Sequence, residues 1–278
     1  MGSSPIHFGG EPSGLRKTDL QAERCRPSDC AVAVRGAEPE APIGVCVPVG
    51  RIDPCRPTLI LTHGMRYRTR YPATWEPLSD LREIGEAAHE RTSVTRPLNI
   101  LHFVWPKASR HLEAGVRNLP AIVRFCIHAF RETDAEGRTL ATSLRELLGQ
   151  GYREPVHFVG HSYGALVNAH AVCALSLAGW GGEAQFTALD VALHLTLGKD
   201  RELLRLLAGN GVGLRVSRLD NYFGPPFFAL GTGIRGAGPG RFGGGHRVAR
   251  THCGVMNFYR DTVRNPRMHA GFNHSILT

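Results

Sequence analysis

The sequence has no long apolar run and few lysines. No stretch of about 18 apolar residues is present, so we expect no transmembrane helix and no stable membrane insertion. The start of the chain lacks the apolar segment of a secretory signal, which predicts a cytoplasmic protein. Lys17, Lys107 and Lys199 are the only lysines, so arginine supplies nearly all of the positive charge behind the formal net charge of +9. These cations are dispersed rather than clustered, which argues against nucleic-acid binding.

Motifs for common cofactors and metals are missing as well. The chain contains neither the phosphate-binding G-x-x-x-x-G-K-[ST] nor the zinc-binding H-E-x-x-H. Two G-x-G-x-x-G matches begin at Gly231 and Gly238, but neither follows a clear strand and opens a helix. We interpret them as parts of one glycine tract, residues 231–245. The sequence therefore predicts no cofactor and no metal.

The cysteines leave two interpretations of the N-terminal region open. Four of the seven cysteines lie in the first fifth of the chain: Cys25, Cys30, Cys46 and Cys55. Two disulfides among them would require an oxidising compartment. The lack of a secretory signal favours reduced thiols instead. The sequence carries no indication of the oligomeric state.

Strand and helix patterns alternate after a polar, turn-rich tail at residues 1–30. The rest of the chain, 31–278, has no linker and is expected to form one domain. The expected strands are 31–35, 43–49, 58–62, 99–104, 156–159, 185–189, 212–219 and 247–249. The expected helices are 81–90, 112–131 with a kink at Pro120, 140–148, 163–177, 200–207 and 255–263. This alternation predicts an α/β fold with a mainly parallel central sheet and helices on both faces.

The strongest chemical signal is a serine between two glycines, in the sequence Gly160-His161-Ser162-Tyr163-Gly164. It follows a buried strand pattern and opens an apolar helix pattern. A strand-to-helix turn this sharp forces the serine into a strained conformation, which only small neighbours permit. The helix N-terminus behind the serine stabilises developing negative charge. This context predicts a nucleophilic Ser162.

These residues resemble the nucleophile elbow of the α/β-hydrolase superfamily and, within it, the lipases and esterases. The segment Leu59-Ile-Leu-Thr-His63-Gly64-Met65 is similar to the His-Gly element after the third strand of that family. Asn99-Ile-Leu-His-Phe-Val-Trp105-Pro106 resembles a strand that ends in Trp-Pro in some bacterial members, although a Trp in this position is more often a core residue. The resemblance implies that the backbone N–H groups of Met65 and Tyr163 form the oxyanion hole.

A serine nucleophile needs a histidine base, and the resemblance places that base between the last strand and the last helix. His252 fits, because a helical pattern follows it directly, and the segment that it begins resembles pancreatic-type lipases. His274 and His269 are the alternatives. His274 lies too close to the end of the sequence for a helix to follow it.

The triad acid has two candidates. Asp220 follows the expected strand 212–219, the usual position in the family. Asp190 ends the preceding strand in Ala188-Leu-Asp-Val-Ala, which resembles an acid-bearing element of pancreatic-type lipases, with Val191 in place of a proline. The sequence favours Asp220 over Asp190.

The expected function is hydrolysis of a small-molecule or lipid carboxylic ester through an acyl-enzyme on Ser162. A thioesterase or acyltransferase could use the same triad. A non-catalytic binding module could also retain the fold. The acyl chain length and a lid are not predicted by any residue pattern.

Overall fold

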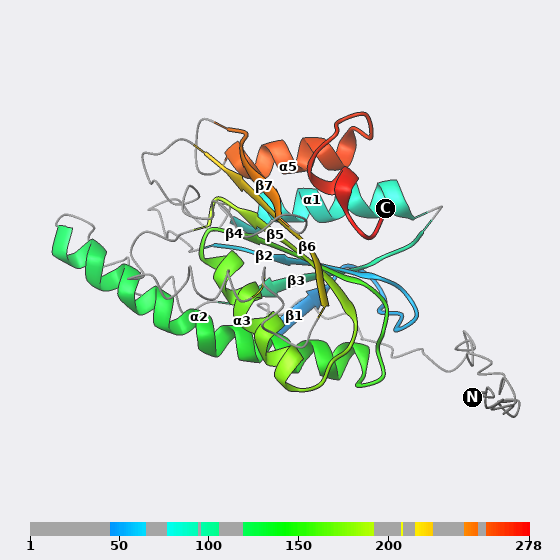
Figure 1. The fold of residues 1–278 in the computed structure, drawn as a ribbon, viewed down its shortest axis with the longest axis horizontal. Coiled ribbons are helices and arrows are strands. Elements are labelled where there is room, and N and C mark those ends of the chain that lie inside the picture. Colours follow the sequence, from blue (N-terminus) through cyan, green and yellow to red (C-terminus); the bar gives the residue numbers. More distant parts are fainter. Residues whose placement is uncertain are drawn as a thin grey trace, which may run out of the picture.

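The computed structural model describes residues 45–64, 77–93, 96–105, 119–191, 207, 215–224, 242–249 and 254–278. Within these ranges one seven-stranded sheet has the order β1-β3-β2-β4-β5-β6-β7 (Figure 1). The strands are β1 (Val45–Pro48), β2 (Thr58–Thr62), β3 (Asn99–Val104), β4 (Val156–His161), β5 (Glu183–Leu189), β6 (Arg215–Phe223) and β7 (Phe242–Arg247). The helices are α1 (Pro77–Thr92), α2 (Leu119–Leu148), α3 (Tyr163–Leu177), α5 (Gly254–Arg264) and the short 3₁₀ helix η4 (Gly271–His274).

The sheet is parallel except at one edge. Strand β1 pairs with β3 in antiparallel orientation, and every other pair of neighbouring strands is parallel. Parallel neighbours need crossover connections over the sheet faces, which is why strand and helix patterns alternate along the chain. The predicted α/β fold with a mainly parallel sheet is confirmed.

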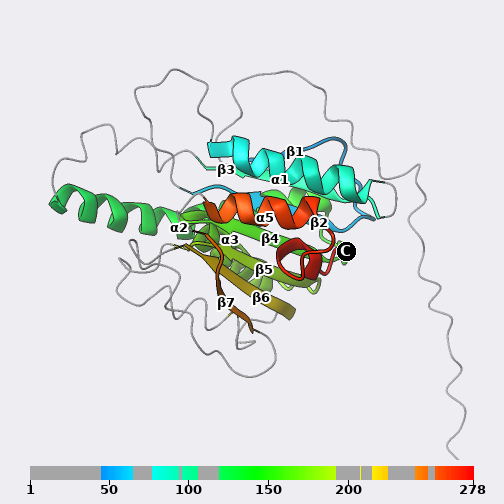
Figure 2. The same ribbon diagram turned by 90° about the horizontal axis from the view of Figure 1, so that it is seen from above.

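Helices cover both faces of the sheet. In Figures 1 and 2, α2 and α3 lie on one face and α1 and α5 lie side by side on the other. Strands β2, β3 and β4 are buried along their whole length, which accounts for their continuous apolar runs. No helix in the described ranges is long and apolar enough to cross a membrane.

Residues 119–131 and 140–148, predicted to belong to two helices, lie in the single helix α2, and residues 112–118 of the first prediction lie outside the described residues. Pro120 is the second residue of α2, where the missing N–H breaks no helical hydrogen bond and no kink arises. Gly137 lies in the middle of α2, and a Cβ there would come within 2.4 Å of the Cβ of His170 on α3. The prediction of two helices was wrong because packing against α3 outweighs the low helix propensity around this glycine.

The last strand also lies earlier than predicted. Strand β7 spans Phe242–Arg247 rather than 247–249, so it includes the end of the glycine tract. Pairing with the backbone of β6 compensates for the low strand propensity of glycine. The tail 1–30, the strand expected at 31–35, most of the glycine tract, and the helix expected at 200–207 apart from Leu207 lie outside the described residues.

Candidate active site

Ser162 connects β4 to α3 in a strained backbone conformation. Its φ is 55° and its ψ is −124°, a combination that residues other than glycine rarely adopt. Its N–H donates a hydrogen bond of 2.9 Å to the carbonyl oxygen of Leu189, at the end of neighbouring β5. Strain of this size costs about 1–3 kcal/mol and persists only where the surrounding structure enforces it. The turn predicted from the sequence is therefore present.

Three glycines provide the space for this turn. A Cβ at Gly160 would come within 2.5 Å of the backbone of Ala165, and one at Gly164 would come within 2.4 Å of the carbonyl oxygen of His63. A Cβ at Gly64 would lie 2.7 Å from the Cβ of Ser162. Real Cβ atoms do not approach this closely, so the end of β2 and the first turn of α3 interlock through glycine. The sequence anticipated this requirement for Gly160 and Gly164.

His63 ties the end of β2 to the end of β3. Its Nδ1 lies 2.6 Å from the carbonyl oxygen of Gly64, and its Nε2 accepts the backbone N–H of Trp105 at 3.2 Å. The indole N–H of Trp105 donates to the carbonyl oxygen of His63 at 2.7 Å, and the two rings stack with centroids 5.8 Å apart. Both side chains are buried. The sequence analysis interpreted Trp105 as a core residue and did not predict these polar contacts, because the sequence does not show which strand ends are neighbours.

Asp190 lies beside Ser162 at the carboxyl edge of the sheet. It follows Leu189, which is paired with His161, so the two residues continue neighbouring strands about 5 Å apart. Asp190 has a φ of 49°. Among the described residues other than glycine, only Asp190 and Ser162 have a positive φ. The backbone N–H of Gly224 lies 3.4 Å from its Oδ1, and its own N–H donates to the carbonyl oxygen of Tyr222. A carboxylate thus stands one strand from the serine.

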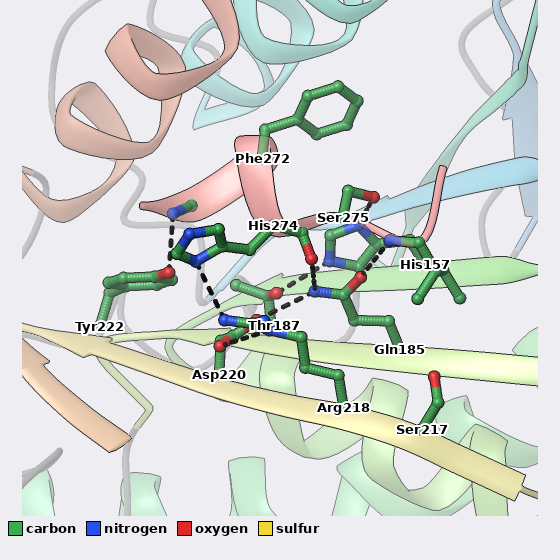
Figure 3. Close-up of polar contacts among 12 residues, drawn as sticks. His157, Gln185, Thr187, Ser217, Arg218, Asp220, Tyr222, Phe272, His274 and Ser275 are labelled. Carbon is green, nitrogen blue, oxygen red and sulfur yellow. Dashed lines mark hydrogen bonds and ion pairs between the residues drawn. The ribbon is translucent and has the colours of Figure 1, made fainter. Parts of the chain in front are cut away.

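Asp220 occupies a different place from the one predicted. It does not follow a strand but lies within β6, paired with Thr187, and it is completely buried. Its carboxylate accepts hydrogen bonds from Arg218 Nε at 2.7 and 2.9 Å and from Gln185 Nε2 at 2.9 Å (Figure 3). Hydrogen bonding to Asp220 raises the pKa of the Arg218 guanidinium. The expected strand ended too early because pairing with β5 and β7 extends β6 to Phe223.

His274 belongs to the same buried cluster as Asp220. Its Nδ1 accepts a hydrogen bond of 3.0 Å from Arg218, and its carbonyl oxygen lies 3.3 Å from Gln185 Nε2 (Figure 3). Gln185 pairs with His157, and Ser162 lies five residues further along β4, about 16 Å away. The structure therefore separates His274 from Ser162.

Hydrogen bonds of His157 and Tyr222 attach the C-terminal segment to the middle of the sheet. His157 contacts the hydroxyls of Ser275 and Thr187, each at 2.8 Å, and burial lowers its pKa to about 3. The hydroxyl of Tyr222 accepts the N–H of Gly271 at 2.7 Å, and burial raises the pKa of this tyrosine to about 12. These contacts identify the cluster as a structural element that holds the end of the chain.

Two of the predicted site residues, His252 and Met65, lie outside the described residues. Strand β7, which ends five residues before His252 in the sequence, is parallel to β4, so the carboxyl end of β7 lies at the same sheet edge as Ser162. His269, the remaining alternative, is exposed. Tyr163 is the first residue of α3, directly after the serine.

The described residues show no group of three or more His, Cys, Asp or Glu side chains that could hold a metal ion. Cys46 is a buried thiol without a disulfide, and burial raises its pKa to about 12. Cys25 and Cys30, two of the three cysteines suggested as its disulfide partners, lie outside the described residues.

Comparisons with known proteins place the chain in no family. No protein-family model matches it, and no curated protein matches its sequence. Among solved structures, TT1662 from Thermus thermophilus is similar over 77% of this chain and 92% of its own, with 17% identity and a TM-score of 0.37. A TM-score this low does not define the fold, which follows from the strand order and pairing of the sheet.

Proposed function

We propose that this protein is a serine hydrolase that cleaves carboxylic esters, lipid esters among them, through an acyl-enzyme on Ser162. The backbone of Ser162 carries the proposal. A positive φ between a buried strand and a helix, with glycines interlocked on both sides, places a serine hydroxyl at the helix N-terminus in α/β-hydrolases. Such strain has no structural benefit of its own and is typical of active sites.

We propose Asp190 as the triad acid in place of Asp220. Its support is its position beside Ser162 at the carboxyl edge, whereas Arg218 and Gln185 already bind the carboxylate of Asp220 inside the sheet. The resulting order along the chain, serine then acid then histidine, is the order of α/β-hydrolases.

The proposed reaction has two steps. The Ser162 hydroxyl attacks the ester carbonyl while His252 takes its proton and passes it to the leaving alcohol. Asp190 orients His252 and stabilises its charged form, and the N–H groups of Met65 and Tyr163 bind the oxyanion. His252 then activates water, which hydrolyses the acyl-enzyme and releases the acid.

Covalent labelling tests the nucleophile directly. We expect a fluorophosphonate probe to add once to the parent protein, to fail on Ser162→Ala and to react at least tenfold more slowly with His252→Ala, as read by intact mass. His274→Ala serves as the matched control and should label at the parent rate. A folded parent that does not label would overturn the proposal in favour of a binding module.

The acyl acceptor separates hydrolysis from acyl transfer. A labelled acyl-enzyme should release free acid into water at a rate that added alcohols and thiols leave unchanged. Faster release with formation of a new ester would instead identify an acyltransferase, and preference for thioester donors would identify a thioesterase.

A further inference from the structure

Trp105 and the Ser162 turn lie on opposite sides of the end of β2. Strand β2 is the neighbour of both β3, which Trp105 follows, and β4, which Ser162 follows. We infer that Trp105 is a positioning residue that acts through His63: it holds the end of β2 against the turn and so limits where the serine side chain can lie. This inference rests on the proposed function, because it concerns the nucleophile of the same site.

The end of β2 is in direct contact with the turn. A Cβ on Gly164 would clash with the carbonyl oxygens of both Thr62 and His63, so the first turn of α3 rests on these two peptides. Gly64 lies against the serine side chain, since a Cβ there would come within 2.7 Å of the Ser162 Cβ. No side chain separates these backbones. A shift of the β2 end would therefore change the space around the nucleophile directly.

Trp105 fixes one of the peptides on which α3 rests. It is completely buried, and its indole N–H donates to the carbonyl oxygen of His63 at 2.7 Å. Its backbone N–H donates to His63 Nε2 at 3.2 Å, and the two rings stack with their centroids 5.8 Å apart. A buried carbonyl cannot turn away from its donor without leaving both groups unpaired, which costs free energy. The His63 carbonyl that faces Gly164 is thus held in one direction.

Two more hydrogen bonds hold the turn from other directions. The hydroxyl of Thr62 donates to Asn168 Oδ1 at 2.6 Å, which joins the end of β2 to the second turn of α3, and both side chains are fully buried. On the side of β5, the N–H of Ser162 donates to the carbonyl oxygen of Leu189 at 2.9 Å. A strained conformation persists only where its surroundings enforce it, and accurate placement of a reacting group requires a fixed shell of neighbours. Trp105 is the outer support of that shell.

The test removes the indole donor alone. Trp105→Phe retains a buried aromatic ring but cannot bond to the His63 carbonyl. We expect kcat for ester hydrolysis and the rate of fluorophosphonate labelling to fall by about tenfold with KM nearly unchanged, because small displacements of a reacting group have large effects on rate. A residue that served only the stability of the fold would not produce this separation of kcat from KM.

Trp180→Phe is the matched control. The indole N–H of Trp180 also donates to a backbone carbonyl, that of Tyr152 at 3.1 Å, and the Trp180 and Tyr152 rings stack. Trp180 is buried as well, but it follows the opposite end of α3, about 22 Å from the serine. Its replacement should lower the melting temperature about as much as Trp105→Phe does. The kcat and the labelling rate should stay at the parent values.

Amide hydrogen exchange at Ser162 gives a readout that needs no activity. Its N–H is bonded to the Leu189 carbonyl, so exchange at this amide reports opening of the turn. Selective ¹⁵N-serine labelling, with Ser162→Ala to assign the signal, makes the exchange measurable by NMR. Exchange should be faster in Trp105→Phe than in the parent and unchanged in Trp180→Phe.

Thr62→Val provides a second variant if Trp105→Phe does not fold. It removes the donor to Asn168 and should change labelling and exchange in the same direction. A folded Trp105→Phe protein with the parental kcat and labelling rate would overturn the inference, and so would equal losses of activity in both tryptophan variants. An inactive parent in which Ser162 exchange responds to Trp105→Phe but not to Trp180→Phe would refute the proposed function and retain the positioning role.

Discussion

Ser162 and Asp190 have positive φ angles of 55° and 49° and lie at the ends of two paired strands. Each of these backbone conformations costs free energy, which packing must offset. Their proximity links the strain to one small region at the carboxyl edge, where parallel α/β sheets bind their ligands. Asp220, by contrast, lies in an extended strand with its charge balanced by Arg218.

Replacement of the proposed acid tests this distinction. Asp190→Asn should lower kcat for ester hydrolysis by about a hundredfold to ten-thousandfold, because the amide cannot stabilise the charged histidine. KM and the melting temperature should change little, since asparagine tolerates the positive φ of this position. Steady-state kinetics and thermal unfolding provide both measurements.

Asp220→Asn is the matched comparison. It leaves Arg218 without its charged partner, so the unfolding free energy should fall by about 1–3 kcal/mol, less than the roughly 3–5 kcal/mol typical of a fully buried pair, because Arg218 remains partly exposed. Urea unfolding measures that loss. The kcat of the folded protein should stay at the parent value, and the reverse pattern in the two variants would reinstate Asp220 as the acid.

At the scale of elements, glycine sets how closely α2 and α3 approach. A Cβ on Gly137 would come within 2.4 Å of the His170 Cβ, 2.8 Å of the Val167 carbonyl and 2.9 Å of the Ala171 nitrogen. Two of these atoms are backbone and cannot move aside by a rotamer change. The glycine therefore serves helix packing, despite its low helix propensity.

Gly137→Ala should consequently destabilise the protein. Alanine gains about 1 kcal/mol in helix propensity, but overpacking against backbone atoms exceeds that gain and leaves a net loss of about 1–3 kcal/mol. Thr142→Ala, at an exposed position of the same helix, should have little effect or stabilise slightly. Chemical unfolding of both variants checks the prediction, and a more stable Gly137→Ala protein would contradict it.

At the scale of the whole molecule, buried neutral histidines make the fold sensitive to acid. Burial lowers the pKa of His157 to about 3 and that of His102 to about 4, below the ordinary value of 6.5. His157 bonds to Ser275 and Thr187, whereas within the described part of the chain His102 has no hydrogen-bond partner. The unfolded chain takes up these protons first, so stability present above about pH 6.5 is lost as pH falls.

At pH 5 each histidine should account for about 2 kcal/mol of lost unfolding free energy relative to pH 7. His157→Gln and His102→Leu should each reduce the difference between urea unfolding at pH 7 and pH 5 by about that amount. His89→Gln, which changes an exposed histidine, should leave the difference unchanged. Equal acid sensitivity in all three variants would refute the assignment.

Several features of the fold followed from local patterns. Thr58–Thr62 and Asn99–Val104 were predicted with their observed bounds because buried parallel strands need continuous apolar runs. Tyr163–Leu177 was equally clear as an apolar helix. The glycines around Ser162 indicated the sharp turn, since only glycine fits where backbones come this close.

Only tertiary structure decided where β6 ends, which carboxylate lies beside Ser162 and that His63 contacts Trp105. Neighbouring strands determine each of these outcomes: pairing extends β6 past Asp220, strand order places Asp190 next to Ser162, and β3 brings Trp105 to His63. The sequence by itself determined the alternation of strands and helices and the strained serine turn, because these depend on residues close in the chain. The choice among distant residues depends on how separate segments pair, and that information is not contained in any local pattern.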